Sequence, residues 1–174
     1  MALLAFLQNN IDRFSEFTGR ILAWLCLLMM LLLCSVVFIR YVLEGGSIAL
    51  QESVTYLHGS IFMLGAAYTL RQDGHVRVDI FYRNMSPRSK AWINCVGGIL
   101  FLLPLCVYFF ISSWGFVQQS WGFREISTEP GGIPAVFLLK TLIPLMAVNL
   151  GLQAFAEILR NLFILIARED STQP

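Results

Sequence analysis

The chain has 174 residues, of which 57% are hydrophobic and 13% are charged, and its formal net charge is +1. Soluble domains carry about 25% charged residues, so this composition excludes an ordinary soluble domain, and the small net charge gives no reason to expect nucleic acid or an acidic ligand as a partner. The mean hydropathy of +0.69 and the lack of an internal repeat predict a single all-α integral membrane domain over residues 1–174.

The N-terminal segment, about residues 1–18, precedes the first apolar run. Its apolar residues recur on one helical face and most of its polar residues on the other. This pattern predicts a short helix that lies at the membrane interface, and an extension of the first span is the alternative. We expect the segment to be retained, because the apolar run that follows ends at the bulky residues Phe38 and Ile39, unlike a cleaved signal.

Four apolar runs are predicted to cross the membrane as helices, and they cover about 21–39, 53–70, 91–117 and 133–156. A helix of about 20 apolar residues spans the hydrocarbon core, and its internal hydrogen bonds satisfy the backbone groups that lipid cannot. The third run is longer than the core requires. We therefore expect it to tilt, or to bend at Pro104.

The connection between the second and third spans carries signals for helix ends. Gly74 is predicted to end the second helix in a left-handed conformation. Ser86 and Pro87 form an N-cap followed by a first-turn proline, so a helix should start there. Between these points the spacing of apolar residues predicts a short helix against the membrane surface.

The distribution of basic residues predicts the orientation. Nine arginines and lysines belong to the N-terminus, the 71–90 loop and the C-terminus, whereas three belong to the other side, namely Arg40, Arg124 and Lys140. Both termini and the 71–90 loop are therefore predicted to be cytoplasmic, and the 118–132 loop periplasmic. This places the protein in a bacterial cytoplasmic (inner) membrane as a multi-pass chain.

Reactive residues are few and scattered. The four cysteines form no close pair and have no histidine at metal-ligand spacing, so we interpret them as apolar filler. His58 lies inside the second span and His75 in the 71–90 loop, and these unmatched depths argue against a haem held by two histidines. His58 is interpreted as a hydrogen-bonded packing residue, with a proton carrier as the alternative. We expect no enzyme activity, no metal and no cofactor.

One polar stripe interrupts the last span. Asn149, Gln153, Glu157 and Asn161 recur every four residues, which places them on one helical face. Contact with lipid would be unfavourable for this face, so it should pack against other helices or a partner. An ion path is the alternative.

Charged residues also mark the ends of the spans. Arg40 closes the first span and Glu52 begins the second, so the two could pair across the connection. Lys140 lies inside the last span and is either a solvated anchor or a partner contact. Arg71, His75 and Asp79 are four residues apart, and we interpret them as a polar cluster that fixes a loop or a subunit, with a proton relay as the alternative.

Several motifs resemble the small membrane (Q) subunit of tripartite ATP-independent periplasmic (TRAP) transporters. The similar residues are Arg40, Ala49-Leu50-Gln51-Glu52, Phe62 to Tyr68, Arg71, His75, Val78, Asp79, Ser86-Pro87, Arg124 to Ser127, Pro130 to Pro134, Ile143-Pro144 and Leu152-Gln153. The resemblance covers nearly the whole chain, and its most specific part runs from Glu52 to Asp79.

The resemblance implies a three-part, secondary-active importer. In such a system a periplasmic binding protein captures the substrate, commonly an organic acid, and a large multi-span subunit carries substrate and sodium. The small subunit is then a scaffold that stabilises the large subunit and helps to dock the binding protein. The resemblance implies structural or subunit-contact roles for Glu52, Gly65, Arg71, His75 and Asp79, and the stripe residues Asn149, Gln153 and Glu157 are further candidates for such contacts.

Docking of the binding protein is assigned to charged residues on the predicted periplasmic side. The candidates are Arg40, Arg124, Glu125, Glu129 and Lys140. Two other functions remain possible at this point. A small homo-oligomeric transporter would need an ionisable residue deep in a span, and the membrane anchor of a redox complex would need haem ligands or a quinone pocket.

Overall fold

The computed structural model describes residues 2–75 and 82–167, and every regular element in these two ranges is a helix. The helices are α1 (Ala2–Val42), α2 (Ile48–Arg71), α4 (Pro87–Gly97), the π-helical turn η1 (Gly98–Leu102), α5 (Leu103–Phe123) and α6 (Val136–Ala167). The helical class predicted from composition is therefore confirmed over the described residues. α4, η1 and α5 follow one another without a break and form one long rod.

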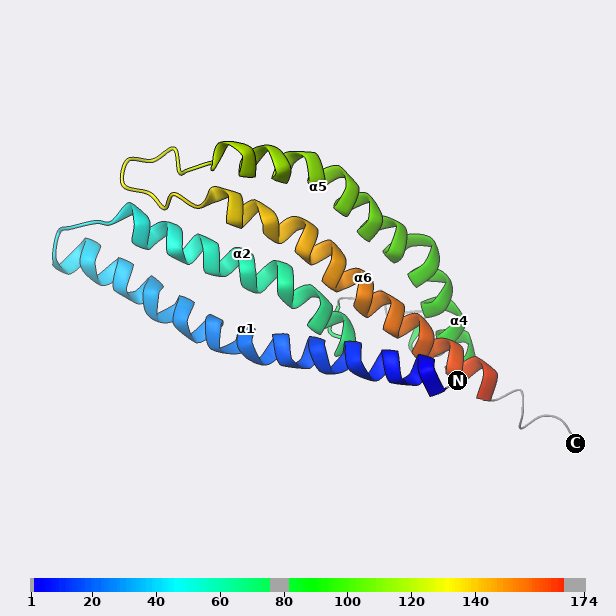
Figure 1. The fold of residues 1–174 in the computed structure, drawn as a ribbon. Coiled ribbons are helices and arrows are strands. Elements are labelled where there is room, and N and C mark those ends of the chain that lie inside the picture. Colours follow the sequence, from blue (N-terminus) through cyan, green and yellow to red (C-terminus); the bar gives the residue numbers. More distant parts are fainter. Residues whose placement is uncertain (1, 76–81, 168–174) are drawn as a thin grey trace, which may run out of the picture.

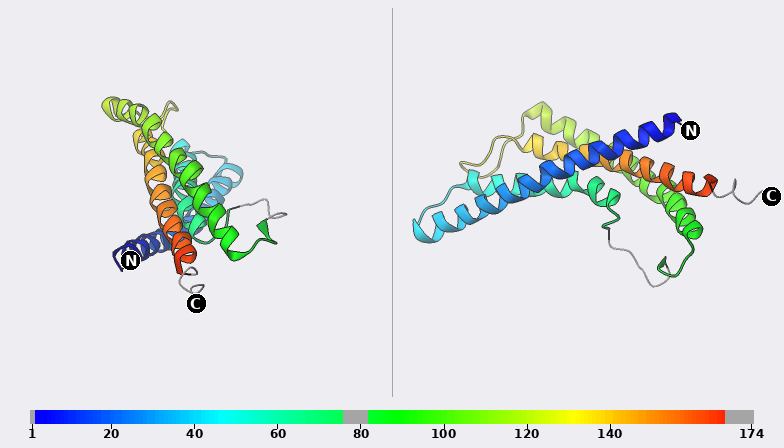
Figure 2. Two further views of the ribbon diagram at one scale, coloured as in Figure 1. Left: turned by 90° about the vertical axis from the view of Figure 1, so that its right-hand side faces the viewer. Right: turned by 90° about the horizontal axis from the view of Figure 1, so that it is seen from below.

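The helices lie side by side in the order α1, α2, α6 and α5, so the last helix in the sequence is central in space (Figure 1). α6 packs against both α2 and α5. The C-terminal part of α6 also contacts α1 and α4. Figure 2 shows α1 crossing this layer so that its first turns approach the end of α6. As a result, 44% of the residues in the most apolar stretch of α6 are buried, against 6% in that of α1.

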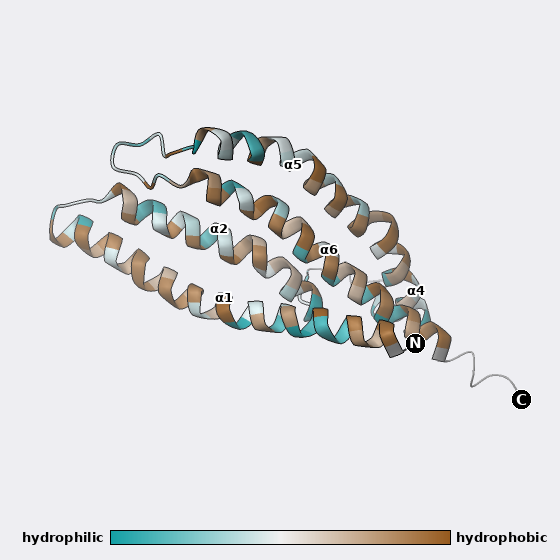
Figure 3. Cartoon of the chain, viewed as in Figure 1, coloured by the Kyte–Doolittle hydropathy of each residue, from teal (hydrophilic) through white to brown (hydrophobic). Residues whose placement is uncertain are grey.

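The layer has two ends, which we name by what they hold. The terminal end holds the beginning of α1, the end of α2, the beginning of α4 and the end of α6, so Ala2 and Ala167, the first and last described residues, both lie there (Figure 1). The hairpin end holds the connections from α1 to α2 and from α5 to α6. Figure 3 shows hydrophobic residues along the helices, with polar residues gathered on the first part of α1 and near the end of α5.

Within the described residues, three helical stretches are long and apolar enough to cross a membrane: Leu3–Val42, Pro87–Phe123 and Val136–Ile166. The first two contain the first and third predicted spans, and the last contains the fourth predicted span from Val136 onward. α2 contains the second predicted span and has 24 residues, but it is not one of the three. Its polar side chains, His58 among them, make it less apolar than the other helices.

The N-terminal segment is not a separate interfacial helix. α1 runs without interruption from Ala2 to Val42, so the alternative, an extension of the first span, describes the structure. The sequence contains no proline in this stretch, and Gly19 does not break the helix because it lies where the Tyr68 ring of α2 packs closely. Tertiary packing holds the first turns in register with the rest of the helix.

Two predicted helix ends can be compared directly with the structure. Ser86 caps α4 by accepting a hydrogen bond from the Ser89 N–H at 3.2 Å, and Pro87 occupies the first turn, as predicted. At the end of α2 the left-handed residue is Asp73, with φ of 55°, and the prediction for Gly74 is wrong. Gly74 instead donates its N–H to the Thr69 carbonyl at 2.9 Å, which is the outer bond of the same C-terminal motif.

The irregular part of the long third rod lies just before Pro104. The π-helical turn Gly98–Leu102 widens the helix, and the Leu103 N–H reaches back to the Gly98 carbonyl. A proline ring clashes with the carbonyl four residues earlier, and a wider turn in that position relieves the clash. The short interfacial helix expected between Gly74 and Ser86 falls mostly on residues outside the described ranges.

Candidate functional site

At the terminal end, Asp12 of α1 joins three helices. Its Oδ1 accepts a hydrogen bond from Gln153 Nε2 at 3.0 Å, and its Oδ2 accepts one from Arg160 Nη2 at 2.8 Å. Arg71 Nε of α2 lies 3.7 Å from the same carboxylate. Because one carboxylate bonds groups from α2 and α6, it fixes the crossing of α1 over both helices.

Gln153 is the centre of the contact between α1 and α6. It has no exposed surface, and Ser15, which donates its hydroxyl to Gln153 Oε1 at 2.6 Å, is 1% exposed. The amide therefore accepts at one end and donates to Asp12 at the other. Two helices far apart in sequence are bonded through a buried pair that leaves neither end of the amide without a partner.

Further ion pairs extend this network. Arg71 donates to Glu16, which also lies 3.8 Å from the exposed Arg20, and Arg160 donates to Glu157. These side chains are partly buried, so their pairing offsets a desolvation cost that isolated charges would carry at this depth. We call the set Asp12, Ser15, Glu16, Arg71, Gln153, Glu157 and Arg160 the terminal network.

The terminal network also reaches α4. Asn161 Nδ2 donates to Glu157 Oε1 at 3.1 Å, and Asn94 of α4 donates to Asn161 Oδ1 at 3.5 Å. Asn94 in turn exchanges hydrogen bonds with the Tyr82 hydroxyl. The stripe on α6 thus binds α1 through Gln153 and α4 through Asn161.

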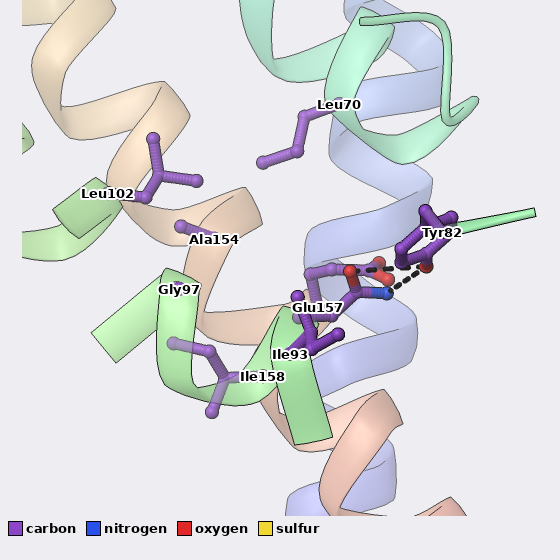
Figure 4. Close-up of a pocket in the computed structure, with 10 residues that line it drawn as sticks. Leu70, Tyr82, Ile93, Gly97, Leu102, Ala154, Glu157 and Ile158 are labelled. Atoms are coloured by element: carbon purple, nitrogen blue, oxygen red, sulfur yellow. Dashed lines mark hydrogen bonds between the residues drawn. The ribbon is translucent and has the colours of Figure 1, made fainter. Parts of the chain in front are cut away.

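A cavity of about 300 Å³ lies beside Asn94, between the ends of α2 and α6 and the α4–η1 segment. Its walls are mostly apolar, including Leu70, Gly97 and Ile158, and Glu157 and Tyr82 form its polar edge (Figure 4). Both carboxylate oxygens of Glu157 already accept hydrogen bonds, from Arg160 and Asn161. The polar edge therefore has a structural role in holding the helices together.

At the hairpin end, Glu52 of α2 fastens the α5–α6 connection. Its carboxylate accepts hydrogen bonds from the Ser127 hydroxyl and, at 2.5 Å, from the Ile133 backbone N–H. A Cβ atom at Gly132 would lie 2.7 Å from Glu52 Oε1, so only glycine allows this approach. The sequence suggested an ion pair between Glu52 and Arg40. The structure does not form it, because the α5–α6 connection already supplies hydrogen bonds to the Glu52 carboxylate.

The surroundings of Glu52 lower the pKa of its carboxyl below the ordinary value of 4.5. The hydrogen bond from Ser127 is the largest cause, followed by that from the Ile133 N–H, and both favour the charged form. At neutral pH the group is therefore a carboxylate, which is the form that accepts both bonds.

A second ion pair lies close by. Lys140 Nζ donates to both carboxylate oxygens of Glu125, at 2.8 and 2.6 Å, and it lies 3.9 Å from the centre of the Phe116 ring. The hydrogen bonds from Lys140 lower the pKa of the Glu125 carboxyl. Lys140 thus has a partner within the chain, and the pair neutralises two of the five docking candidates.

The other three docking candidates remain exposed at the hairpin end. Arg40 ends α1, and within the described residues it makes no ion pair. Arg124 follows α5 with φ of 49°, and its guanidinium lies 5.7 Å from the Phe137 ring centre. Glu129 is exposed in the connection and is held there by its own N–H, which donates to Ser127 Oγ at 3.1 Å.

The remaining candidates are spread along α2 and α6. Gly65 faces Leu22 of α1, where an added Cβ would lie 3.6 Å from a methyl group. Asn149 is 8% exposed and donates to the Leu64 carbonyl of α2 at 3.1 Å. His58 is exposed and stacks on Phe62 with 6.4 Å between ring centres, and its role as a hydrogen-bonded packing residue stays a prediction.

The structure does not bring Arg71 and His75 together. Arg71 turns to α1, and His75 is exposed beyond the end of α2. Asp79 lies outside the described residues. Because α2 ends at Arg71, the helical spacing of four does not extend to His75.

The α1 residues of the terminal network, Asp12, Ser15 and Glu16, were not predicted from the sequence. Asp12 and Glu16 were placed on the polar, outward face of an interfacial helix, and Arg160 was counted only for orientation. A usable signal was present, because Asp12, Ser15 and Gly19 recur at helical spacing and form a face of small and polar residues. Such a face in an apolar chain marks a helix contact.

Comparison with known proteins gives one family. The model of the tripartite ATP-independent periplasmic transporters, DctQ component, matches residues 11–163. No curated protein and no solved structure gives a significant match. The match covers most of the chain, including α1 from Ile11, one residue before Asp12, and all but the last four residues of α6.

Proposed function

Because the chain belongs to the DctQ family of TRAP transporter components, we propose that it is the static scaffold subunit of a sodium-coupled solute importer. It is a bacterial inner-membrane protein and not an enzyme. The large multi-span subunit would carry the substrate and bind the sodium. This chain would bind no cofactor. Membership of the family, rather than any missing site, decides against a homo-oligomeric transporter and against a redox anchor.

The observation that supports a static role is the way the polar side chains bond to one another. The terminal network joins α1, α2 and α6, and Glu52 joins α2 to the α5–α6 connection. Both ends of the layer are therefore tied, which favours motion as one body over relative sliding of its helices. A scaffold beside a moving transport subunit needs this rigidity.

We further propose that α2, which contains the second predicted span, also crosses the membrane, so that the chain has four spans. Both termini would then be cytoplasmic. α2 packs along its length between α1 and α6, each of which can cross a membrane. The excess of arginines and lysines at the terminal end supports a cytoplasmic location for that end.

The experiment for the scaffold role uses the full chain with an affinity tag. We expect the large subunit to co-purify with it, and we expect uptake into proteoliposomes only when all three components and a sodium gradient are present. Replacement of sodium by potassium should abolish uptake. Solute uptake by this chain alone, at a rate similar to that of the full system, would contradict the proposal.

Docking of the binding protein is proposed for the exposed charges of the hairpin end. Reversal of charge in Arg124→Glu or Glu129→Lys should raise the binding-protein concentration that gives half-maximal uptake and leave the maximal rate unchanged, because rim charges mainly affect association. Arg83→Glu, an exposed arginine at the terminal end, is the matched control. Equal effects of Arg83→Glu and Arg124→Glu would contradict docking at the hairpin end.

A further inference from the structure

A second pocket at the terminal end is lined by arginines. It has a volume of about 340 Å³ and lies between α1 and the end of α2, where Arg13, Glu16, Phe17, Arg20 and Arg71 surround it. Three arginines and one carboxylate thus line the pocket, and Arg71 is also paired with Asp12 behind it. Arg13 and Arg20 entered the sequence analysis only through the orientation of the chain, and the scaffold function does not require the pocket.

The positive charge of this pocket is not fully compensated. Glu16 is bonded to Arg71, and it lies 3.8 Å from Arg20, whose side chain is 78% exposed. Arg13 is exposed, and the structure gives it no ion pair among the residues that it describes. Arg13 and Arg20 are therefore available to an anion, and guanidinium groups suit phosphate because they can donate two parallel hydrogen bonds.

The surroundings of the pocket favour a lipid over a soluble phosphate. Arg13, Phe17, Arg20 and Trp24 share one face of α1, and Phe17 and Trp24 are 63% and 73% exposed. Beyond Trp24 the same side of the helix continues with exposed apolar residues, which are Leu27, Leu28 and Leu31. A molecule whose phosphate meets the arginines would lay its acyl chains along this apolar surface.

We propose that this pocket binds the headgroup of an anionic phospholipid. Arg13 and Arg20 contact the phosphate, Phe17 covers it from the helix surface, and the Arg71–Glu16 pair forms the fixed floor. Trp24 marks the boundary between headgroup and acyl chains, which is where tryptophan is enriched in membrane proteins. The lipid would hold the start of α1 against α2 at the membrane surface.

The test measures lipid binding to the purified complex that contains the full chain. The complex is delipidated in detergent and titrated with phosphatidylglycerol or with phosphatidylcholine of the same acyl chains, and bound lipid is counted by native mass spectrometry. We expect tighter binding of phosphatidylglycerol. Each arginine near a membrane surface contributes about 1 kcal/mol, so Arg13→Gln and Arg20→Gln should each weaken this binding by about fivefold and leave phosphatidylcholine binding unchanged.

Arg40→Gln is the matched control, because Arg40 is an exposed arginine at the opposite end of the same helix. An equal loss in Arg40→Gln would show general charge attraction and overturn the proposal, as would unchanged binding in the Arg13→Gln/Arg20→Gln double variant. Displacement of the lipid by inorganic phosphate at equal concentration would assign a soluble anion instead. Arg13→Lys/Arg20→Lys keeps both charges and should recover most of the affinity, which separates loss of binding from loss of folding.

Discussion

Gln153 is buried in an apolar layer because both ends of its amide are bonded to α1, to Ser15 and to Asp12. The sequence made Gln153 a candidate for contact with another subunit, but a side chain with no exposed surface cannot touch another subunit directly. Its role in this chain is to join α1 to α6. The consequences of replacing it should therefore appear in the stability of the chain itself.

Gln153→Leu should destabilise the chain by roughly 1–3 kcal/mol, because the Ser15 hydroxyl and one Asp12 oxygen lose a buried partner. The measurement is the thermal unfolding midpoint of the purified complex. Gln118→Leu, an exposed glutamine on α5, is the control and should leave the midpoint nearly unchanged. If both variants behave alike, the buried amide does not stabilise the helix layer.

The contribution of Glu52 to the stability of the chain depends on pH, because only the charged carboxylate accepts both of its hydrogen bonds. The pKa of Glu52 in the folded chain is lower than the ordinary value of 4.5, so the stability that it contributes is fully present above that value. This stability is lost as the pH falls from about 4.5 through the lowered pKa. The α5–α6 connection should therefore be firmly held at neutral pH and loosen only in acid.

Glu52→Gln should weaken this attachment at neutral pH. The amide offers one oxygen for two donors and points an N–H₂ group at the other donor. We expect faster hydrogen–deuterium exchange at the Ile133 amide. We also expect the native chain to lose protection of this amide in acid and the variant to show no such pH dependence. Glu44→Gln, in the exposed α1–α2 connection, should leave exchange at Ile133 as it is. A native-like protection factor in Glu52→Gln would refute the role of the carboxylate.

At the scale of the helices, the contact between α1 and α2 depends on a close approach at Gly19. A Cβ atom there would lie 2.4 Å from the Tyr68 ring, which is closer than real Cβ contacts. The two helices also meet at Gly65 and through Arg71. Small residues at helix contacts let backbones approach, and this is a main source of helix association in membranes.

Gly19→Ala should cost about 1–3 kcal/mol, because either the Tyr68 ring or the whole of α1 must shift. The thermal midpoint of the complex is again the measurement. Gly115→Ala, where an added Cβ meets nothing within 4 Å, should be neutral or slightly stabilising. The double variant Gly19→Ala/Tyr68→Leu should recover part of the loss, and failure to do so would show that the ring is not what the Cβ meets.

At the scale of the whole molecule, the helix layer has to be placed in a bilayer. If α2 crosses the membrane with the other three helical rods, the two hairpin-end connections share one side and the α2–α4 connection lies on the other. The native cysteines lie on the helices, and Cys26 and Cys34 are exposed on the apolar surface of α1. Exposed positions in the connections can therefore be probed by single introduced cysteines.

Gly46→Cys and Thr128→Cys should react with a membrane-impermeant maleimide in intact cells, and Asn84→Cys should react only after permeabilisation. All three positions are exposed, and the unmodified chain is the control for the native cysteines. Labelling of Gly46→Cys and Asn84→Cys from the same side would mean that α2 does not cross the membrane. The inverse pattern at all three positions would reverse the proposed orientation.

The sequence by itself determined the helical class, the family and several helix ends. These are local properties, because hydropathy depends on composition along a segment, and a cap such as Ser86 with Pro87 acts on its own helix. The family resemblance covered nearly the whole chain and was most specific from Glu52 to Asp79, and the family match supports it. About the site, sequence analysis could say that the stripe on the last helix must be covered.

Only the tertiary structure decided what covers that stripe. α6 inserts between α2 and α5, so the stripe meets α1, α2 and α4 of the same chain, and Asp12 becomes the centre of a network instead of a surface residue. Likewise Glu52 bonds the distant Ile133 N–H and leaves Arg40 unpaired within the described residues. The physical reason is that helix formation depends on neighbours in sequence, whereas pairing depends on which helices become neighbours in space.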